Sequence, residues 1–388
     1  MGSRGSLPVL VVTTGYLALL AALSLARPAA VGGPAPAQNG AKPNVLVIFA
    51  DDLNHWAGPL GRNRQAATPN IDRLAARGVT FTNAHAAAPA CNPSRAALLS
   101  GLRPSTTGVY DNQVDWRPHI AREKTLITHF RSNGYVTLGA GKAYHGSFDR
   151  EEEWDEYGVE RNRECKLLNA NDGVGGIKFS PVDCGDEGIS DYSIADYGIA
   201  QLERKHGKPF LLTVGFHKPH MPWNVPKKYF DMYPLEKIHL PKEPANIREG
   251  VPAAAFSINP PNYGLKEQDL RQAIQAYYAT VTFMDAQVGK VLDALDKLGL
   301  RENTIIVFLS DHGMPLPFAK TQLYHHSSRT PLMIRWPGVT KAGSVDEAHM
   351  ISTVDLLPTI LDMLQIAQPG GFDGTSFAAV LKGESQPE

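Results

Sequence analysis

The chain has 388 residues, of which 43% are hydrophobic and 20% are charged, and its formal net charge at pH 7 is -1. This composition excludes an intrinsically disordered chain, because it holds enough apolar side chains to bury a core. The near-zero charge also excludes a global field that would attract nucleic acid or an anionic membrane surface, so any recognition of an anion must be local.

The first 42 residues are typical of an export segment ahead of a fold. Arg4 precedes an apolar stretch at 7–26 that ends in small residues suited to cleavage. We predict a signal peptide at 1–26; the alternative, an uncleaved membrane anchor, would be the only membrane contact. Residues 27–42 are rich in Pro, Gly and Ala and predict a flexible linker before one large domain at 43–388.

An exported protein is therefore expected. The sequence contains no Asn-x-Ser/Thr acceptor for N-glycosylation. This favours a bacterial periplasmic or secreted protein over a eukaryotic one in a lysosome-like compartment.

Five uninterrupted apolar runs predict strands that are buried on both faces. They lie at 44–50, 135–140, 210–216, 304–310 and 331–336. Helical patterns occur at 70–77, 94–99, 125–132, 194–205, 267–298 and 354–364. This alternation predicts an α/β fold with a mainly parallel central sheet and helices on both faces.

Polar side chains follow four of these runs, at the point where each strand ends. They are Asp51 and Asp52 after the first run, Lys142 and His145 after the second, His217 and His220 after the third, and Asp311 and His312 after the fourth. Ligands of such sheets bind at the carboxyl ends of the strands. We therefore expect one site to hold these side chains.

The acidic strand ends predict a divalent cation site. Asp51, Asp52 and Asp311 supply hard oxygen ligands, and His312 can add a nitrogen. Helix capping is the alternative for the first two aspartates alone, but the second acidic strand end favours a metal. An imidazole suits zinc or manganese, whereas three carboxylates suit calcium or magnesium, and we expect one calcium ion.

Cationic and proton-transferring side chains would surround that metal. They are Arg95, Lys142, His145, His220 and Lys320. Together they suit an anionic tetrahedral group, sulfate or phosphate, whose charge must be stabilised during transfer. Taken singly, each is more often a solvated surface charge or a core histidine.

The chain has three cysteines. In an oxidising compartment Cys165 and Cys184 could close a loop and leave Cys91 unpaired. A buried core thiol is one interpretation of Cys91. Its sequence neighbours indicate another.

Residues 91–95 (CNPSR), followed by 98–101 (LLSG), resemble the signature of the sulfatase family, in which the cysteine is converted to Cα-formylglycine. Residues 134–145 (GYVTLGAGKAYH) resemble the family's second signature. Within the family, 210–234 and 278–295 are most similar to iduronate-2-sulfatases. The resemblance extends from residue 43 to the end of the chain.

The resemblance implies an alkaline-phosphatase-like sulfatase fold and a catalytic domain at 43–388 that hydrolyses sulfate esters of sulfated glycans. By this resemblance one hydroxyl of the hydrated aldehyde attacks sulfur and the alcohol leaves. The other hydroxyl then loses its proton and expels inorganic sulfate, which regenerates the aldehyde. A formylglycine-generating enzyme or an anaerobic sulfatase-maturing enzyme is the implied partner.

The resemblance also implies a role for each site residue. The metal would be bound by Asp51, Asp52, Asp311, His312 and the converted Cys91. The hydrate would be held by Arg95 and Lys142, and its proton would be transferred by His145. The substrate would be contacted by His217, His220 and Lys320, and a disulfide would join Cys165 to Cys184.

Two stretches depart from the iduronate-2-sulfatase pattern. Residues 314–320 (MPLPFAK) look more like sulfamidases, which makes an N-sulfatase the first alternative. The end at Glu388 predicts a truncated C-terminal subdomain. A phosphate or phosphonate ester hydrolase of the same fold and an inactive glycan-binding relative are the further alternatives.

Overall fold

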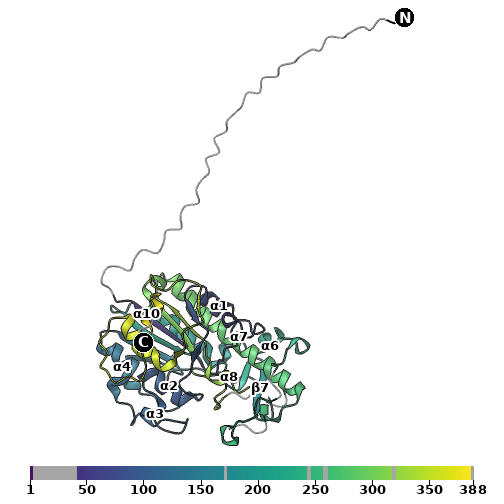
Figure 1. Ribbon diagram of the computed structural model, residues 1–388, viewed down its shortest axis with the longest axis horizontal. Coiled ribbons are helices and arrows are strands. Elements are labelled where there is room, and N and C mark those ends of the chain that lie inside the picture. Colours follow the sequence, from purple (N-terminus) through teal and green to yellow (C-terminus); the bar gives the residue numbers. More distant parts are fainter. Residues whose placement is uncertain (3–41, 170–172, 243–245, 257–260, 317–319, 386–388) are drawn as a thin grey trace. The chain divides into compact units, whose positions relative to one another are not determined.

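The computed structural model describes residues 1–2, 42–169, 173–242, 246–256, 261–316 and 320–385 (Figure 1). The predicted signal peptide and linker thus lie outside the described residues, except for their first two positions and Lys42. The described chain from Lys42 onward belongs to one compact unit. Within the described ranges, no helix has the length and apolar character needed to cross a bilayer.

An eight-stranded sheet forms the centre of this unit, with the strand order β12-β2-β11-β10-β1-β8-β4-β5. Its strands are β1 (Asn44–Ala50), β2 (Val79–Phe81), β4 (Val136–Gly141), β5 (Glu156–Gly158), β8 (Phe210–Gly215), β10 (Thr304–Ser310), β11 (Leu332–Arg335) and β12 (Ser344–Asp346). Neighbouring strands from β10 to β5 are parallel, whereas β11 is antiparallel to β10 and β2. The predicted fold class is confirmed.

The register of the parallel strands aligns their carboxyl ends. Ala50 at the end of β1 pairs with Ser310 at the end of β10, and Gly215 at the end of β8 pairs with Gly141 at the end of β4. The residues that follow these strands therefore emerge at the same edge of the sheet. Asp51, Lys142 and Asp311 are among them.

Helices cover both faces of the sheet because the central strands are apolar on both sides. Leu46 and Ile48 of β1 share a core with α1 (Pro69–Ala75), α5 (Ser190–Glu203), α6 (Lys227–Asp231) and α7 (Glu267–Lys297). Val45 and Val47 point into a second core with α2 (Cys91–Ser100), α4 (Leu126–Ser132), α9 (Leu356–Met363) and α10 (Ala378–Leu381). Figure 1 shows α1 and α7 on one side and α2 and α4 on the other.

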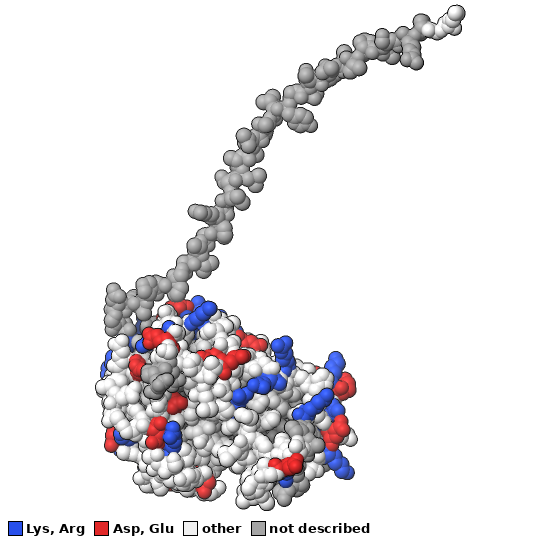
Figure 2. All heavy atoms as spheres, in the orientation of Figure 1, with Lys and Arg blue, Asp and Glu red and all other residues white. Residues whose placement is uncertain are grey.

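Shorter elements complete the described part of the unit. They are β3 (Ala84–His85) paired with β13 (Ile351–Ser352), the small sheet of β6 (Gly173–Val174), β7 (Ile177–Val182) and β9 (Trp223–Pro226), and the helices α3 (Pro104–Thr107) and α8 (His325–Ser328). A disulfide joins Cys165 to Cys184, just after β7. On the face shown in Figure 2, basic and acidic side chains are interspersed, in keeping with the small net charge.

Candidate active site

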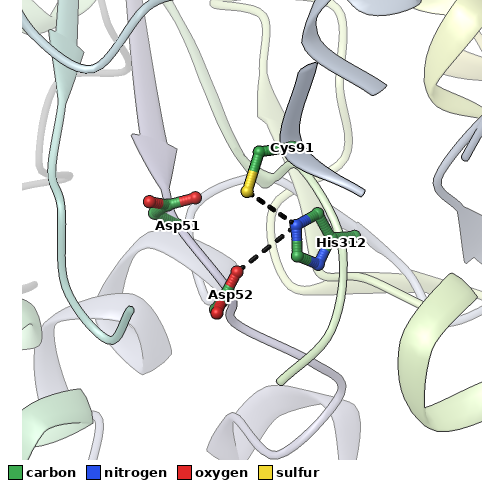
Figure 3. A group of neighbouring side chains, drawn as sticks. All are labelled: Asp51, Asp52, Cys91 and His312. Atoms are coloured by element: carbon green, nitrogen blue, oxygen red, sulfur yellow. Dashed lines mark hydrogen bonds and ion pairs between the residues drawn. The ribbon is translucent and has the colours of Figure 1, made fainter. Parts of the chain in front are cut away.

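Cys91 is the first residue of α2 and is completely buried. Its Sγ lies 3.1 Å from Nε2 of His312, and that same nitrogen lies 3.3 Å from Oδ1 of Asp52. Figure 3 shows these three side chains converging on one point, with Asp51 beside them. The thiol that the sequence singled out is therefore in contact with the predicted metal ligands.

Four side chains form a group with the geometry of a metal site. One ligand atom from each of Asp51, Asp52, Cys91 and His312 lies within 4.8 Å of the others, and all four residues are buried. The two aspartates follow β1, and His312 follows β10. Asp52 has a left-handed backbone with φ of 63°, a conformation that Asp tolerates better than most residues.

Asp311, the fifth predicted ligand, lies beside this group. One of its carboxylate oxygens accepts hydrogen bonds from the backbone N–H groups of Asp52 at 3.2 Å and His312 at 2.9 Å. The other oxygen lies 3.8 Å from Nε2 of His312. This carboxylate thus holds the ends of β1 and β10 together as well as facing the site.

Arg95, one turn along α2 from Cys91, connects the aspartates. Its Nε donates to Asp311 at 2.9 Å and its Nη2 to Asp51 at 3.2 Å, while Nη1 donates to the carbonyl groups of Lys142 and Ala143. Burial alone would lower the pKa of Arg95, but Asp311 and Asp51 raise it above its usual value. The guanidinium is therefore a fixed positive charge.

Two lysines neutralise the paired aspartates. Nζ of Lys142 lies 2.5 Å from Asp51, and Nζ of Lys320 lies 2.9 Å from both carboxylate oxygens of Asp52. Nε2 of His220 lies 3.9 Å from Asp52. Burial would raise the pKa of Asp52, but Lys320, His220 and His312 lower it, so this carboxylate is ionised.

The pKa of His312 is raised by its charged neighbours. Burial would lower its pKa, but Asp311, Cys91 and Asp52 raise it to about 9. Its Nδ1 lies 2.8 Å from the carbonyl oxygen of Gly313, so Nδ1 bears a proton and Nε2 faces the group.

Within the described ranges, neither His145 nor His217 makes a side-chain hydrogen bond or ion pair with the four-residue group. Burial, followed by Lys142 and Arg95, lowers the pKa of His145 to about 4, and its Nδ1 has no hydrogen-bond partner within the described ranges. His217 instead lies 2.8 Å from Glu160, which raises the pKa of the imidazole against the effect of burial.

Several supporting residues carry no sequence motif. The hydroxyl of Tyr277 on α7 donates to the carbonyl of Asp52 at 2.9 Å. Asp191 on α5 accepts from the backbone N–H groups of His217 and Lys218. Their only sequence signal is a polar residue within an apolar helical pattern, which core hydrogen bonding explains equally well.

The charges of the site favour an anionic ligand once a metal is bound. The charges of the three aspartates are matched by those of Arg95, Lys142 and Lys320. His312, with a pKa of about 9, adds no negative charge. A divalent cation would add an excess positive charge in a buried site, where charge interactions are strong. The arrangement therefore suits binding and polarisation of a tetrahedral oxyanion.

The fold is that of alkaline-phosphatase-like hydrolases. The chain superposes on the phosphonate monoester hydrolase of Agrobacterium radiobacter with a TM-score of 0.74 at 23% identity, covering 89% of this chain and 78% of that one. It also superposes on a protein bound to its substrate, D-glucosamine-2-N,6-O-disulfate, with a TM-score of 0.68 at 23% identity, covering 88% of this chain and 81% of that one. These likenesses show the shared fold.

Sequence comparison specifies the family. Residues 43–366 match the Sulfatase family model, so the chain belongs to the sulfatase family. It is 36% identical to iduronate 2-sulfatase of Mus musculus over 76% of this chain and 34% identical to a sulfatase of Formosa agariphila over 83%. The chain spans 60% of the length of the mouse protein and 69% of the Formosa protein. The family resemblance is thereby confirmed.

Proposed function

We propose that the protein hydrolyses sulfate esters of sulfated glycans, as an iduronate-2-sulfatase-like enzyme that uses a formylglycine made from Cys91 and one calcium ion. One observation carries this proposal: Sγ of Cys91 lies 3.1 Å from His312 within a buried group that includes Asp51 and Asp52. A free core thiol would have no need of acidic and cationic neighbours.

The donor set fits a hard cation after conversion of Cys91. Calcium prefers oxygen ligands, which Asp51 and Asp52 supply and a thiol does not. Replacing the thiol by a hydrated aldehyde would place an oxygen at the same position, with His312 and Asp311 completing the set. The bound ion would supply electrostatic stabilisation of charge that develops on the sulfate oxygens.

The chain's own residues then have distinct tasks. Arg95 and Lys142 both form ion pairs with Asp51 and so fix its carboxylate in place. Their positive charges would also stabilise the deprotonated hydrate. His145, neutral because its pKa is about 4, can accept a proton from that hydrate. Lys320 and His220, which face Asp52, would contact the sulfate and the leaving oxygen, and His217 would contact a more distant part of the substrate.

The substrate class rests on the relatives. An O-sulfatase is supported by 36% identity to a protein named iduronate 2-sulfatase and by 31% identity to an ulvan-active sulfatase of Formosa agariphila. The neighbours that bind D-glucosamine-2-N,6-O-disulfate or hydrolyse phosphonate monoesters share the fold at 23% identity. N-sulfatase and phosphonate hydrolase activities are therefore the rival outcomes of the assay.

Co-expression with a formylglycine-generating enzyme tests the proposal. Intact-mass analysis should show the change from CH2–SH to CHO at Cys91, and the product should release sulfate from a 2-O-sulfated uronate disaccharide. Cys91→Ala should show neither. An unconverted Cys91, or turnover of an aryl phosphonate or glucosamine-N-sulfate without turnover of the uronate sulfate, would contradict it.

Export of the protein is part of the same proposal. The disulfide between Cys165 and Cys184 supports an oxidising compartment. We propose that 1–26 is a signal peptide, 27–42 a linker and 43–388 the catalytic domain. Expression in a Gram-negative host should yield a periplasmic product that begins after residue 26, and a full-length cytoplasmic product would contradict this assignment.

A further inference from the structure

A cavity of about 460 Å³ lies next to the candidate active site and has no part in the mechanism above. The segment after β1 and the segment near 240 form its walls, and α8 closes one side. Its polar lining includes His55, Arg62, Arg64, His239, Lys242 and His326. No described residue that lines it is acidic.

The cavity is rich in positive charge that is not balanced by any acidic side chain among the described residues of its lining. Arg62, Arg64 and Lys242 are exposed, and none of them makes an ion pair with another described residue. A protein with nearly equal numbers of acidic and basic residues usually intersperses them, as it does on the face in Figure 2. Three unpaired cations around one hollow indicate a site for an anion.

A buried histidine points to the same ligand. His55 is only 7% exposed, lines the cavity, and its Nδ1 has no hydrogen-bond partner within the described ranges. Burial lowers its pKa to about 3, and His326, Arg329 and Arg62 add to this effect. A neutral imidazole in that position can donate an N–H to an anion that the cations attract.

Two stretches of backbone place the cavity close to the active site. His55 follows Asp52 by three residues, so their Cα atoms are at most about 11 Å apart. On the other wall, the N–H of Gly313, next to His312, donates to the carbonyl of Ser327 at 2.7 Å. The two sites therefore lie within the reach of one short oligosaccharide.

We propose that this cavity binds a second acidic group, a sulfate or a carboxylate, of a polyanionic glycan whose first sulfate occupies the active site. This inference rests on the proposed function and narrows its substrate class to glycans with at least two acidic groups. Arginine suits the task because its planar guanidinium binds oxyanions with two hydrogen bonds. The cavity would determine which glycans the enzyme prefers, and it would take no part in hydrolysis of the sulfate ester.

The test compares three substrates with the converted enzyme: an aryl sulfate, a disaccharide with a 2-O-sulfated uronate, and the same disaccharide with a second sulfate. In the double variant Arg62→Gln/Arg64→Gln, the ratio of kcat/KM for the disulfated disaccharide to that for the aryl sulfate should fall about tenfold or more. The matched control Lys205→Gln/Lys297→Gln removes two exposed charges from the opposite edge of the sheet and should keep the wild-type ratio.

The arms of the experiment separate the possible ligands. A loss for both disaccharides assigns the carboxylate to the cavity, and a loss for the disulfated one alone assigns the second sulfate. Unchanged ratios for both would overturn the inference. The inference would also be overturned if the variant differed from wild type only in how added inorganic sulfate changes its activity. The cavity would then bind a free anion and not a group of the substrate.

Failure of the proposed function is recognised separately. If the wild-type protein turned over none of the three substrates, calorimetric titration with the disulfated disaccharide would still test the cavity. Binding should weaken about tenfold or more in the Arg62→Gln/Arg64→Gln variant. Equal binding by the two proteins would overturn the inference, and matching thermal unfolding midpoints exclude misfolding as the cause.

Discussion

Nζ of Lys320 lies 2.9 Å from each carboxylate oxygen of Asp52, a residue 268 positions earlier in the chain. Both side chains are largely buried, and the pKa of Lys320 is raised because the attraction of Asp52 outweighs the effect of burial. The contact places a permanent positive charge beside Asp52, one of the predicted metal ligands.

Replacing Lys320 tests this role. Lys320→Met should lower kcat/KM for an aryl sulfate about 100-fold or more, because the variant removes a charge that stabilises the developing negative charge. Lys320→Arg should retain more activity than Lys320→Met. Lys341→Met, at an exposed position, is the matched control. Activity of Lys320→Met within threefold of wild type would exclude a catalytic contact.

Arg95 should be more important for folding than any exposed arginine. Its guanidinium has four acceptors, two carboxylates and two carbonyl groups, and Lys cannot reproduce that fork. Arg95→Lys should therefore still lower the free energy of unfolding by about 3 kcal/mol, since it leaves buried acceptors unpaired. Urea unfolding followed by circular dichroism measures this. Arg161→Lys, at an exposed position, should leave the urea midpoint unchanged, and an equally unchanged midpoint for Arg95→Lys would contradict the assignment.

Much of the fold was predictable because its central strands are uninterrupted apolar runs. The run at 304–310 is β10, and the helical pattern at 267–298 is α7, which ends one residue earlier. The convergence of Asp51, Asp52 and His312 followed from the alignment of strand ends in a parallel sheet. Pairings between side chains were not predictable in the same way. His217 pairs with Glu160, and no local pattern marks that contact across 57 residues.

The cavity beside the site illustrates the same limit. Arg62 and Arg64 lie in a segment without periodicity, where an isolated charge is normally a solvated one. Only the fold shows that they share a hollow with Lys242, almost 180 residues later in the chain. Sequence spacing predicts which residues leave one sheet edge, but it does not predict which loops meet there.

Metal binding should stabilise the protein through the four-residue group. Treatment with EDTA followed by titration of CaCl2 should raise the thermal unfolding midpoint by several degrees, because ligand at 100 times its Kd adds about 2.7 kcal/mol. Asp51→Asn/Asp52→Asn should abolish this rise. The control Glu236→Gln/Glu384→Gln, which removes two exposed acids, should retain it. A rise with ZnCl2 but not CaCl2 would contradict the choice of calcium.

Asp285 of α7 should stabilise the start of α1. Its carboxylate accepts the backbone N–H of Ile71 at 2.8 Å and that of Asn70 at 3.1 Å, although Asp285 lies more than 200 residues after both of them in the chain. Asp285→Ala removes this cap and should lower the free energy of unfolding by about 1–2 kcal/mol. Asp285→Asn retains a side-chain acceptor and should lower the free energy of unfolding less than Asp285→Ala does. Equal loss in both variants would show that packing, and not capping, is the cause.

The same residue predicts a pH dependence of stability. Burial raises the pKa of Asp285 from 3.8 to about 6, although the hydrogen bonds from Ile71 and Asn70 lower it. Between these two values the folded state binds the proton more tightly than the unfolded chain does. The contribution of Asp285 is therefore fully present below about pH 4 and is lost as the pH rises towards 6, by up to about 3 kcal/mol. Urea unfolding at several pH values should show wild type losing stability relative to Asp285→Asn across this window. A difference that stays constant from pH 4 to pH 7 would mean that the carboxylate titrates alike in both states.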